Sequence, residues 1–207
     1  MRVYKFLTVH FALKSLYEKR LKISRIDDLN DPFELIPYDL SLKALRWAMK
    51  STRDQLAVNR GILSFSATWH DPVVWAHYSD RHRGMCLGFE VPDAHCKLIS
   101  YVLERLTFPE SPTLEHAVAM LSTKFSNWEY EQEVRIWVDL TDEEDGLYFK
   151  DFDDSLKLTE VIVGHGCTVP RSAIVRAIVP LATEINLIKA RAGFKKFEIV
   201  NDERGLK

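Results

Sequence analysis

The segment EQEVRIWVDL, residues 131–140, contains the side chains whose types and spacing best suit chemistry. Strand alternation puts its charged residues and one tryptophan on a single face: Glu131, Glu133, Arg135, Trp137 and Asp139. Two carboxylates about 7 Å apart beside a guanidinium suit acid–base catalysis, contacts to ribose hydroxyls or stabilisation of a cationic transition state. The alternative is a solvent-exposed sheet face with cross-strand ion pairs. Trp137 favours the first interpretation, because a fully exposed tryptophan is uncommon.

A second set of candidate residues lies in DPVVWAHYSDRHRG, residues 71–84. Asp71 followed by Pro72 predicts a helix start, and Gly84 predicts its end about three turns later. The side chains of interest are Trp75, His77, Tyr78 and His82, with Trp75, Tyr78 and His82 on one helical face. The imidazoles can shuttle protons or bind an anion; the alternatives are packing for His77 and a favourable helix-end charge for His82. We predict no metal site, because their spacing of five residues is poor for two ligands on one helix.

Two shorter segments add polar side chains. NDPFE, residues 30–34, is rich in turn-forming residues, so a tight turn is its simplest interpretation. The same turn can present side chains to a ligand: Asn30, Asp31, Phe33 and Glu34. In SFS, Ser64 and Ser66 share one face of an expected strand. Glycine-rich phosphate loops and a nucleophile elbow are absent from the sequence.

The elements that must position these residues predict an α+β fold in a single domain, residues 1–207. Strands are expected at residues 2–7, 21–26, 62–66, 85–91, 131–140, 160–163, 185–190 and 196–200. Helices are expected to start at Thr8, Ser41, Asp71, Thr113 and Pro170, with the fourth extending to Phe125. These signals do not repeat as regular βαβ units. We therefore expect a mixed or mainly antiparallel sheet with several packed helices.

Composition limits the functional classes. Hydrophobic residues make up 46% of the chain, so a large core is available. The formal net charge is −2, which does not support nucleic-acid binding. Lys5, His10 and Lys14 interrupt the apolar N-terminal segment, and no apolar run is long enough for a membrane span. Three widely spaced cysteines suit a reducing compartment. We expect a cytoplasmic protein without a membrane partner; the sequence leaves its oligomeric state open.

Six segments together resemble a bacterial family catalogued only as a domain of unknown function, number twenty-nine seventy-one. They are VYKF (3–6), LNDPFE (29–34), LSFS (63–66), WAHYSDRHRGMCLGFE (75–90), WEYEQEVR (128–135) and EVIVGHGC (160–167). The resemblance covers nearly the whole chain. It implies a single-domain bacterial protein, sometimes encoded near defence or mobile-element genes, and it supplies no activity.

The order of three motifs is similar to that of ADP-ribosyltransferases. These enzymes carry a polar or basic residue on an early strand, a serine-containing strand and a Glu-x-Glu strand; here Arg2 or His10, residues 64–66 and residues 131–133 follow that order. The resemblance implies that Glu133 holds the nicotinamide ribose and that Glu131 orients the acceptor. Tyr78 or Trp75 would stack on the nicotinamide. The chain departs from the pattern in Arg135 beside the acidic pair and in SFS instead of Ser-Thr-Ser.

Three functional hypotheses follow. The first is an enzyme that uses NAD or a related nucleotide as substrate, an ADP-ribosyltransferase or NAD glycohydrolase in a defence or toxin context; its catalytic residues would be Glu131, Glu133, His77 and Tyr78. The second is a non-catalytic module that binds a small anionic ligand or nucleotide through Arg135, His77, His82 and the NDPFE turn. The third is a metal-dependent nuclease that places Asp31, Glu34, Glu131 and Glu133 around a divalent ion.

Overall fold

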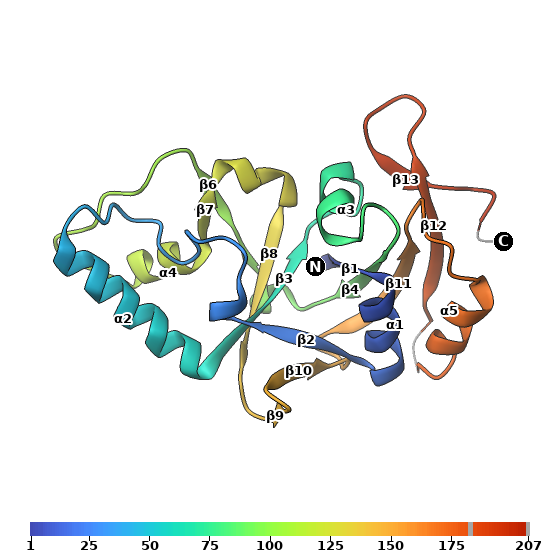
Figure 1. Ribbon diagram of the computed structural model, residues 1–207, viewed down its shortest axis with the longest axis horizontal. Helices are drawn as coiled ribbons and strands as arrows, with labels where there is room; N and C mark the ends of the chain where they lie inside the picture. The colour runs from blue at the N-terminus through green and yellow to red at the C-terminus, as the bar shows by residue number, and fades with distance from the viewer. Residues whose placement is uncertain (182–183, 206–207) are drawn as a thin grey trace. The chain divides into compact units, whose positions relative to one another are not determined.

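The computed structural model describes residues 1–181 and 184–205 and shows an α+β fold (Figure 1). This confirms the fold class expected from the sequence. The chain forms two compact units: the first contains residues 1–22, 65–96 and 150–207, and the second contains residues 23–64 and 97–149. The assignment of one domain to the chain stays a prediction. Within the described residues, no helix combines the length and apolar composition needed to span a bilayer.

The first unit contains a mixed sheet in the order β13-β12-β11-β4-β1 (Figure 1). These strands are β1 (Arg2–Leu7), β4 (Met85–Glu90), β11 (Lys157–Val163), β12 (Asn186–Ala192) and β13 (Ile199–Asn201). β4 is antiparallel to both β1 and β11, whereas β12 is parallel to β11. All residues of β4 except Glu90 are buried, because the sheet is covered on both faces. At Gly88 an added Cβ would come within 2.9 Å of the Glu160 side chain, so glycine allows the close approach of β11.

Three helices belong to the first unit: α1 (Val9–Glu18), α3 (Pro72–Tyr78) and α5 (Arg171–Ile178). The predicted caps at Thr8 and Asp71 are confirmed, since the Thr8 side chain accepts from Phe11 N and Asp71 accepts from two backbone amides of the first turn of α3. The expected three-turn length of α3 is wrong. Residues 80–82 have φ between 45° and 66°, and Gly84 N donates to Ser79 O at 2.8 Å, so a left-handed turn ends the helix at Tyr78.

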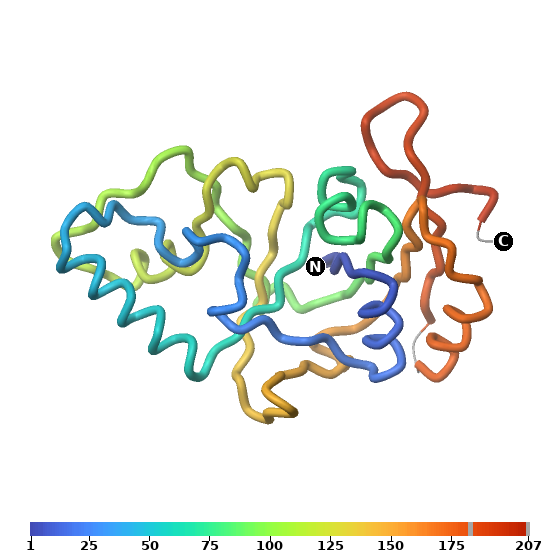
Figure 2. Tube along the Cα trace, viewed as in Figure 1, coloured from blue at the N-terminus to red at the C-terminus, as the bar shows by residue number. Residues whose placement is uncertain are grey.

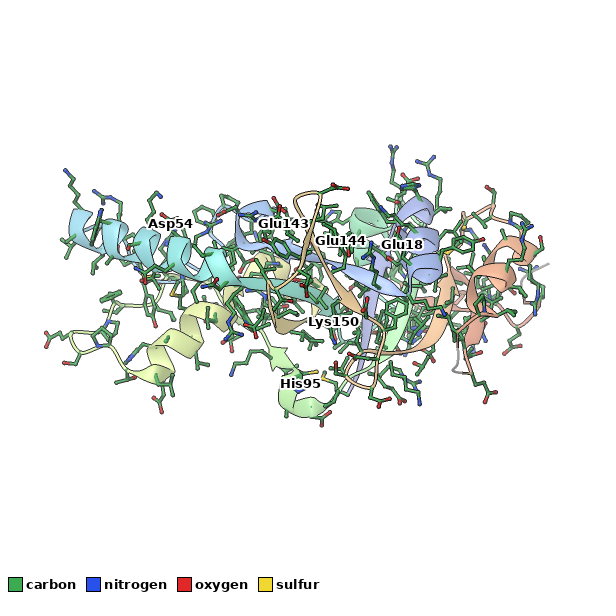
Figure 3. The ribbon with its side chains drawn as sticks, turned by 90° about the horizontal axis from the view of Figure 1, so that it is seen from below. Glu18, Asp54, His95, Glu143, Glu144 and Lys150 are labelled. Atoms are coloured by element: carbon green, nitrogen blue, oxygen red, sulfur yellow. The ribbon has the colours of Figure 1, made fainter. Side chains whose placement is uncertain are left out.

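In the second unit, β3 (Arg60–Ser66) lies between β2 (Arg20–Arg25) and β8 (Glu133–Asp139). The sheet continues through β5 (Lys97–Leu98) on one side and through β10 (Leu147–Asp151) and β9 (Glu143–Glu144) on the other. Asp145 and Gly146 join β9 to β10 with φ of 52° and 78°, as a tight hairpin requires. Figure 3 labels Glu143 and Glu144 on β9. The polar segment TDEEDG, residues 141–146, therefore contains β9 and the turn of this hairpin.

The helices of the second unit are α2 (Lys43–Asn59) and α4 (Leu114–Ser122); Figure 3 labels Asp54 on α2. Their apolar sides join a core that includes Ile26, Leu35, Tyr38, Met49 and Met120. The predicted cap of α4 is confirmed, because Thr113 and His116 form a capping box. The predicted Ser41 cap of α2 is wrong: the N-cap is Leu42, without a side-chain hydrogen bond.

A separate pair of parallel strands completes the second unit: β6 (Ser100–Val102) and β7 (Thr123–Phe125). The expectation that α4 extends to Phe125 is therefore wrong. Among the described residues, three short 3-10 turns connect other elements: η1 (Ile26–Asp28), η2 (Asp93–His95) and η3 (Ser126–Glu131).

Candidate functional site

The predicted site residues belong to both units. The second unit holds Asn30, Asp31, Phe33, Glu34, Ser64, Glu131, Glu133 and Arg135. The first unit holds Ser66, Trp75, His77, Tyr78 and His82.

Five charged residues of the second unit form a buried cluster, here called the charge network: Glu34, Lys124, Glu131, Glu133 and Arg135. Each is at most 7% exposed. This burial rules out a solvent-exposed sheet face for Glu133 and Arg135, whereas Asp139 at the end of the row is exposed and pairs with Arg60. Charged side chains are rarely buried to this degree unless they are paired, so the partners of each carboxylate decide what the cluster can do.

Arg135 is the centre of the charge network. Its Nε and Nη2 donate to the two carboxylate oxygens of Glu133, at 2.8 Å and 2.9 Å, in a bidentate arrangement. Nη2 also lies 2.7 Å from Glu34 Oε1. Glu133 and Arg135 are two positions apart on β8, so strand alternation brings them to the same face, as the sequence predicts.

Lys124 on β7 supplies the second positive charge of the network. Its Nζ lies 2.5 Å from Glu131 Oε2 and 3.2 Å from Glu133 Oε2, and it also lies over the ring of Trp128 at 4.7 Å. The predicted position of Glu131 on the same strand as Glu133 is wrong. Glu131 ends η3, and Gln132 adopts a left-handed φ of 43° before β8 begins.

The electrostatics of the network keep Glu133 ionised. Burial alone would raise the pKa of Glu133, but hydrogen bonds and charge from Arg135, together with Lys124 and a hydrogen bond from Ser64, lower it to about 2. Burial raises the pKa of Glu34, and Arg135 offsets this only in part. The pKa of Lys124 is raised, because its two glutamate partners outweigh the effect of burial. Both Glu133 oxygens are thus occupied by cations, which leaves this carboxylate poorly suited to accept a proton.

The NDPFE segment forms the expected turn. Asp31 Oδ1 accepts from Phe33 N at 2.9 Å, and Asp31 O accepts from Glu34 N at 3.1 Å. Asp31 is buried, and Asn30 is exposed. The turn directs Glu34 to Arg135 and leaves the Phe33 side chain 56% exposed.

A cavity of about 260 Å³ lies beside the charge network in the second unit. Its walls are the loop with Phe33, Ile36 and Pro37, residues 102–105, and the strand β7 with Lys124. The sequence did not reveal this cavity, because residues 33–37 and 102–105 are far apart in the chain and carry no motif.

Hydrogen bonds join the two loops that form the walls. Asp39 N donates to Leu106 O at 2.8 Å, and Leu106 N donates to Pro37 O at 2.9 Å. Arg105 Nη1 donates to the carbonyl oxygens of Ile36 and Tyr38, each at 2.8 Å. Figure 2 shows the two loops between β2 and α2 and between β6 and α4. The cavity is therefore fixed by the fold before any ligand binds.

The predicted residues of the first unit serve mainly in packing. Trp75 is fully buried, its Nε1 donates to Trp69 O at 2.6 Å, and its ring is parallel to that of His82 at 6.3 Å. Burial, with a smaller effect of His165, lowers the pKa of His82, which makes it a weaker cation than expected. The Trp75 ring is buried and lies against the ring of His82. It therefore has no exposed surface on which a nicotinamide could stack, as the resemblance to ADP-ribosyltransferases implies for Trp75.

The other predicted residues of this unit differ in exposure. His77 is exposed, and its ring meets Tyr78 edge-on at 6.0 Å. Ser66 is buried and its Oγ accepts from Thr68 N at 3.3 Å. Within residues 1–181 and 184–205, no group of three or more His, Cys, Asp or Glu residues could hold a metal ion.

Sequence reasoning missed three functional candidates: Lys124, Arg105 and Trp128. Lys124 was assigned to the end of a helix, where its approach to Glu131 could not be foreseen. The available signal in the sequence is the position of Lys124, four residues before Trp128 and seven before Glu131, and this signal is weak.

No family model, no curated protein and no solved structure matches this chain. Its resemblances to the bacterial family and to ADP-ribosyltransferases therefore stay predictions.

Proposed function

We propose that this chain is a binding module for a small, largely apolar ligand, which occupies the cavity of the second unit. The observation that supports the proposal most is a cavity of about 260 Å³ whose two loop walls are hydrogen-bonded to each other. Ligand sites are typically concave, mostly apolar and largely formed in advance. Fixing the walls in advance lowers the entropic cost of binding.

In this proposal the charge network positions the walls. Glu34, which follows Phe33 in the loop, pairs with Arg135, while Lys124 of β7 pairs with Glu131 and Glu133. The network thus ties both the loop and β7 to the residues of β8 and η3. Glu133 and Arg135 would be positioning residues, and the ligand would contact the apolar side chains.

The cavity is tested by filling it. We expect Val102→Trp, which places a large ring in the lining, to weaken binding of a naphthyl probe such as naphthoate by roughly tenfold or more, or about 1.4 kcal/mol. Titration calorimetry measures the change. Val58→Trp is the matched control, since Val58 is 68% exposed on α2 of the same unit and lies outside the lining. Wild-type protein that binds no naphthyl probe, or two variants that bind equally well, would contradict the proposal.

The NAD-using enzyme is the second candidate function. Two observations favour it: β3, with Ser64, pairs with β8, and the Ser64 side chain hydrogen-bonds Glu133. The serine strand and the Glu-x-Glu segment are therefore neighbours, as the resemblance to ADP-ribosyltransferases implies. The occupied oxygens of Glu133 weigh against it, because a ribose hydroxyl would have to displace Arg135 or Lys124.

Nicotinamide release from NAD tests this second candidate. If the chain is such an enzyme, the purified protein releases nicotinamide, and Glu133→Gln lowers the rate by about a hundredfold or more, because it removes the charge that stabilises a cationic transition state. Chromatography of the reaction mixture measures the product. The candidate is abandoned if wild type gives no nicotinamide or if a folded Glu133→Gln variant matches it.

A further inference from the structure

We infer that the ligand of the cavity in the second unit carries a carboxylate or phosphate group, and that Arg105 binds this group. The inference rests on the proposed binding function and specifies the chemical class of the ligand. It predicts an aromatic or otherwise apolar body in the cavity and an anion beside residue 105.

The two cations of the lining differ in their partners. Lys124 is buried and already paired with Glu131 and Glu133. Arg105 is exposed, and among the described residues no carboxylate forms an ion pair with it. Apart from the exposed carboxylate of Glu104, the positive charge of Arg105 is thus the charge that the lining leaves for a ligand.

The guanidinium of Arg105 is held in place by the protein. Nη1 uses its two hydrogens for the carbonyl oxygens of Ile36 and Tyr38, each at 2.8 Å. The guanidinium carbon lies 5.2 Å from the centre of the Phe33 ring, another lining residue. Hydrogen bonds to one side and an aromatic contact restrict the orientation of the group, so little entropy remains to be lost when an anion binds.

The restricted orientation leaves the Nε–Nη2 edge of Arg105 for bidentate binding. This edge presents two parallel N–H groups that match the oxygens of a carboxylate or phosphate. Arg135 in the same unit uses the same edge to bind Glu133, at 2.8 Å and 2.9 Å. The Nε–Nη2 edge of Arg105 can therefore bind an anionic ligand as the same edge of Arg135 binds Glu133.

Three probes with one naphthyl body separate the possibilities: naphthoate, naphthyl phosphate and the neutral naphthamide. We expect wild-type protein to bind at least one of the two anions roughly tenfold more tightly than naphthamide. The stronger of the two anions identifies the carboxylate or phosphate class. Arg105→Gln should bring the affinity for the anions down to that for naphthamide, and naphthamide binding by this variant reports an intact cavity.

Arg46→Gln is a closely matched control. Arg46 Nη1 also donates to two loop carbonyl oxygens, those of Leu40 and Ser41, at 2.8 Å each, but Arg46 does not line the cavity. It should retain the preference for the anions. Equal affinities of wild type for anions and naphthamide would overturn the inference and leave the binding function standing, even if Arg105→Gln fails to fold. A preference that survives in Arg105→Gln would also overturn it, whereas absence of binding by all three probes would overturn the proposed function itself.

Discussion

Replacing Arg135 by methionine is expected to lower the free energy of unfolding by about 3–5 kcal/mol, the largest stability change that we expect from a single substitution in this chain. Methionine preserves much of the length and the apolar stem of arginine. It removes the guanidinium that binds Glu133 through two hydrogen bonds and lies 2.7 Å from Glu34. Glu34, Glu131 and Glu133, each at most 6% exposed, would then be left with a single cation, Lys124, whose ion pairs are with Glu131 and Glu133. Urea denaturation followed by circular dichroism measures the loss.

The control for this experiment is Arg60→Met. Arg60 lies 2.8 Å from Asp139, but the two side chains are 48% and 64% exposed. Exposed ion pairs contribute about 0–1 kcal/mol, because water screens both charges and the side chains lose entropy. If Arg60→Met and Arg135→Met lowered the free energy of unfolding by similar amounts, burial would not determine how much the charge network contributes to stability.

Local signals in the sequence were sufficient for much of the fold. Asp71 followed by Pro72 predicted the start of α3, and Thr113 predicted that of α4, because capping depends on residues two or three positions apart. The alternation in β8 correctly predicted that Glu133 and Arg135 share a face. Such features depend on side chains and backbone close together in the chain.

The errors have a different physical origin. The turn after Tyr78 depends on the left-handed backbone of residues 80–82, none of which is a glycine that would indicate such a turn. Gln132 adopts the same left-handed backbone region just before β8. The first ends an expected helix early, and the second makes an expected strand begin late. Their backbone conformations are imposed by tertiary contacts, which intrinsic propensity does not record.

The candidate site was predicted only in part for the same reason. The sequence identified Glu133, Arg135 and Glu34 as notable, and the structure brings all three together. It could not identify Lys124 as their partner, since that contact depends on how β7 approaches β8. Arg105 was equally hidden, because its role depends on two carbonyl groups of a loop that lies about seventy residues earlier.

These contacts change the meaning of the acidic row. A carboxylate available for catalysis needs a free oxygen and a pKa near the working pH. Glu133 has both oxygens occupied and a pKa of about 2, which are properties of a structural ion pair. The chemistry that the sequence indicated at residues 131–135 is therefore better explained as support for the neighbouring cavity.

Glu133→Gln is expected to lower stability most at neutral pH, and the difference from wild type should shrink in acid. The folded protein lowers the pKa of Glu133 from 4.5 to about 2, so ionised Glu133 stabilises the fold above about pH 4.5. This contribution is lost as the pH falls through 4.5 towards 2, and a shift of this size corresponds to roughly 3 kcal/mol. The raised pKa of Glu34 acts in the opposite direction, since protonating Glu34 favours the folded state as the pH falls.

The comparison of wild type with Glu133→Gln reports the charge of Glu133 together with its interaction with Glu34, because ionised Glu133 also raises the pKa of Glu34. Urea denaturation at several values between about pH 7 and about pH 3 should give a stability difference that declines steadily with acid. Glu143→Gln is the control: Glu143 is exposed on β9, where it accepts a hydrogen bond from the Tyr148 hydroxyl, and its replacement should change stability little at any pH. A difference for Glu133→Gln that stays constant over this range would mean that Glu133 is not held ionised by Arg135 and Lys124. The charge network would then need another explanation, with a protonated Glu133 once more available for proton transfer.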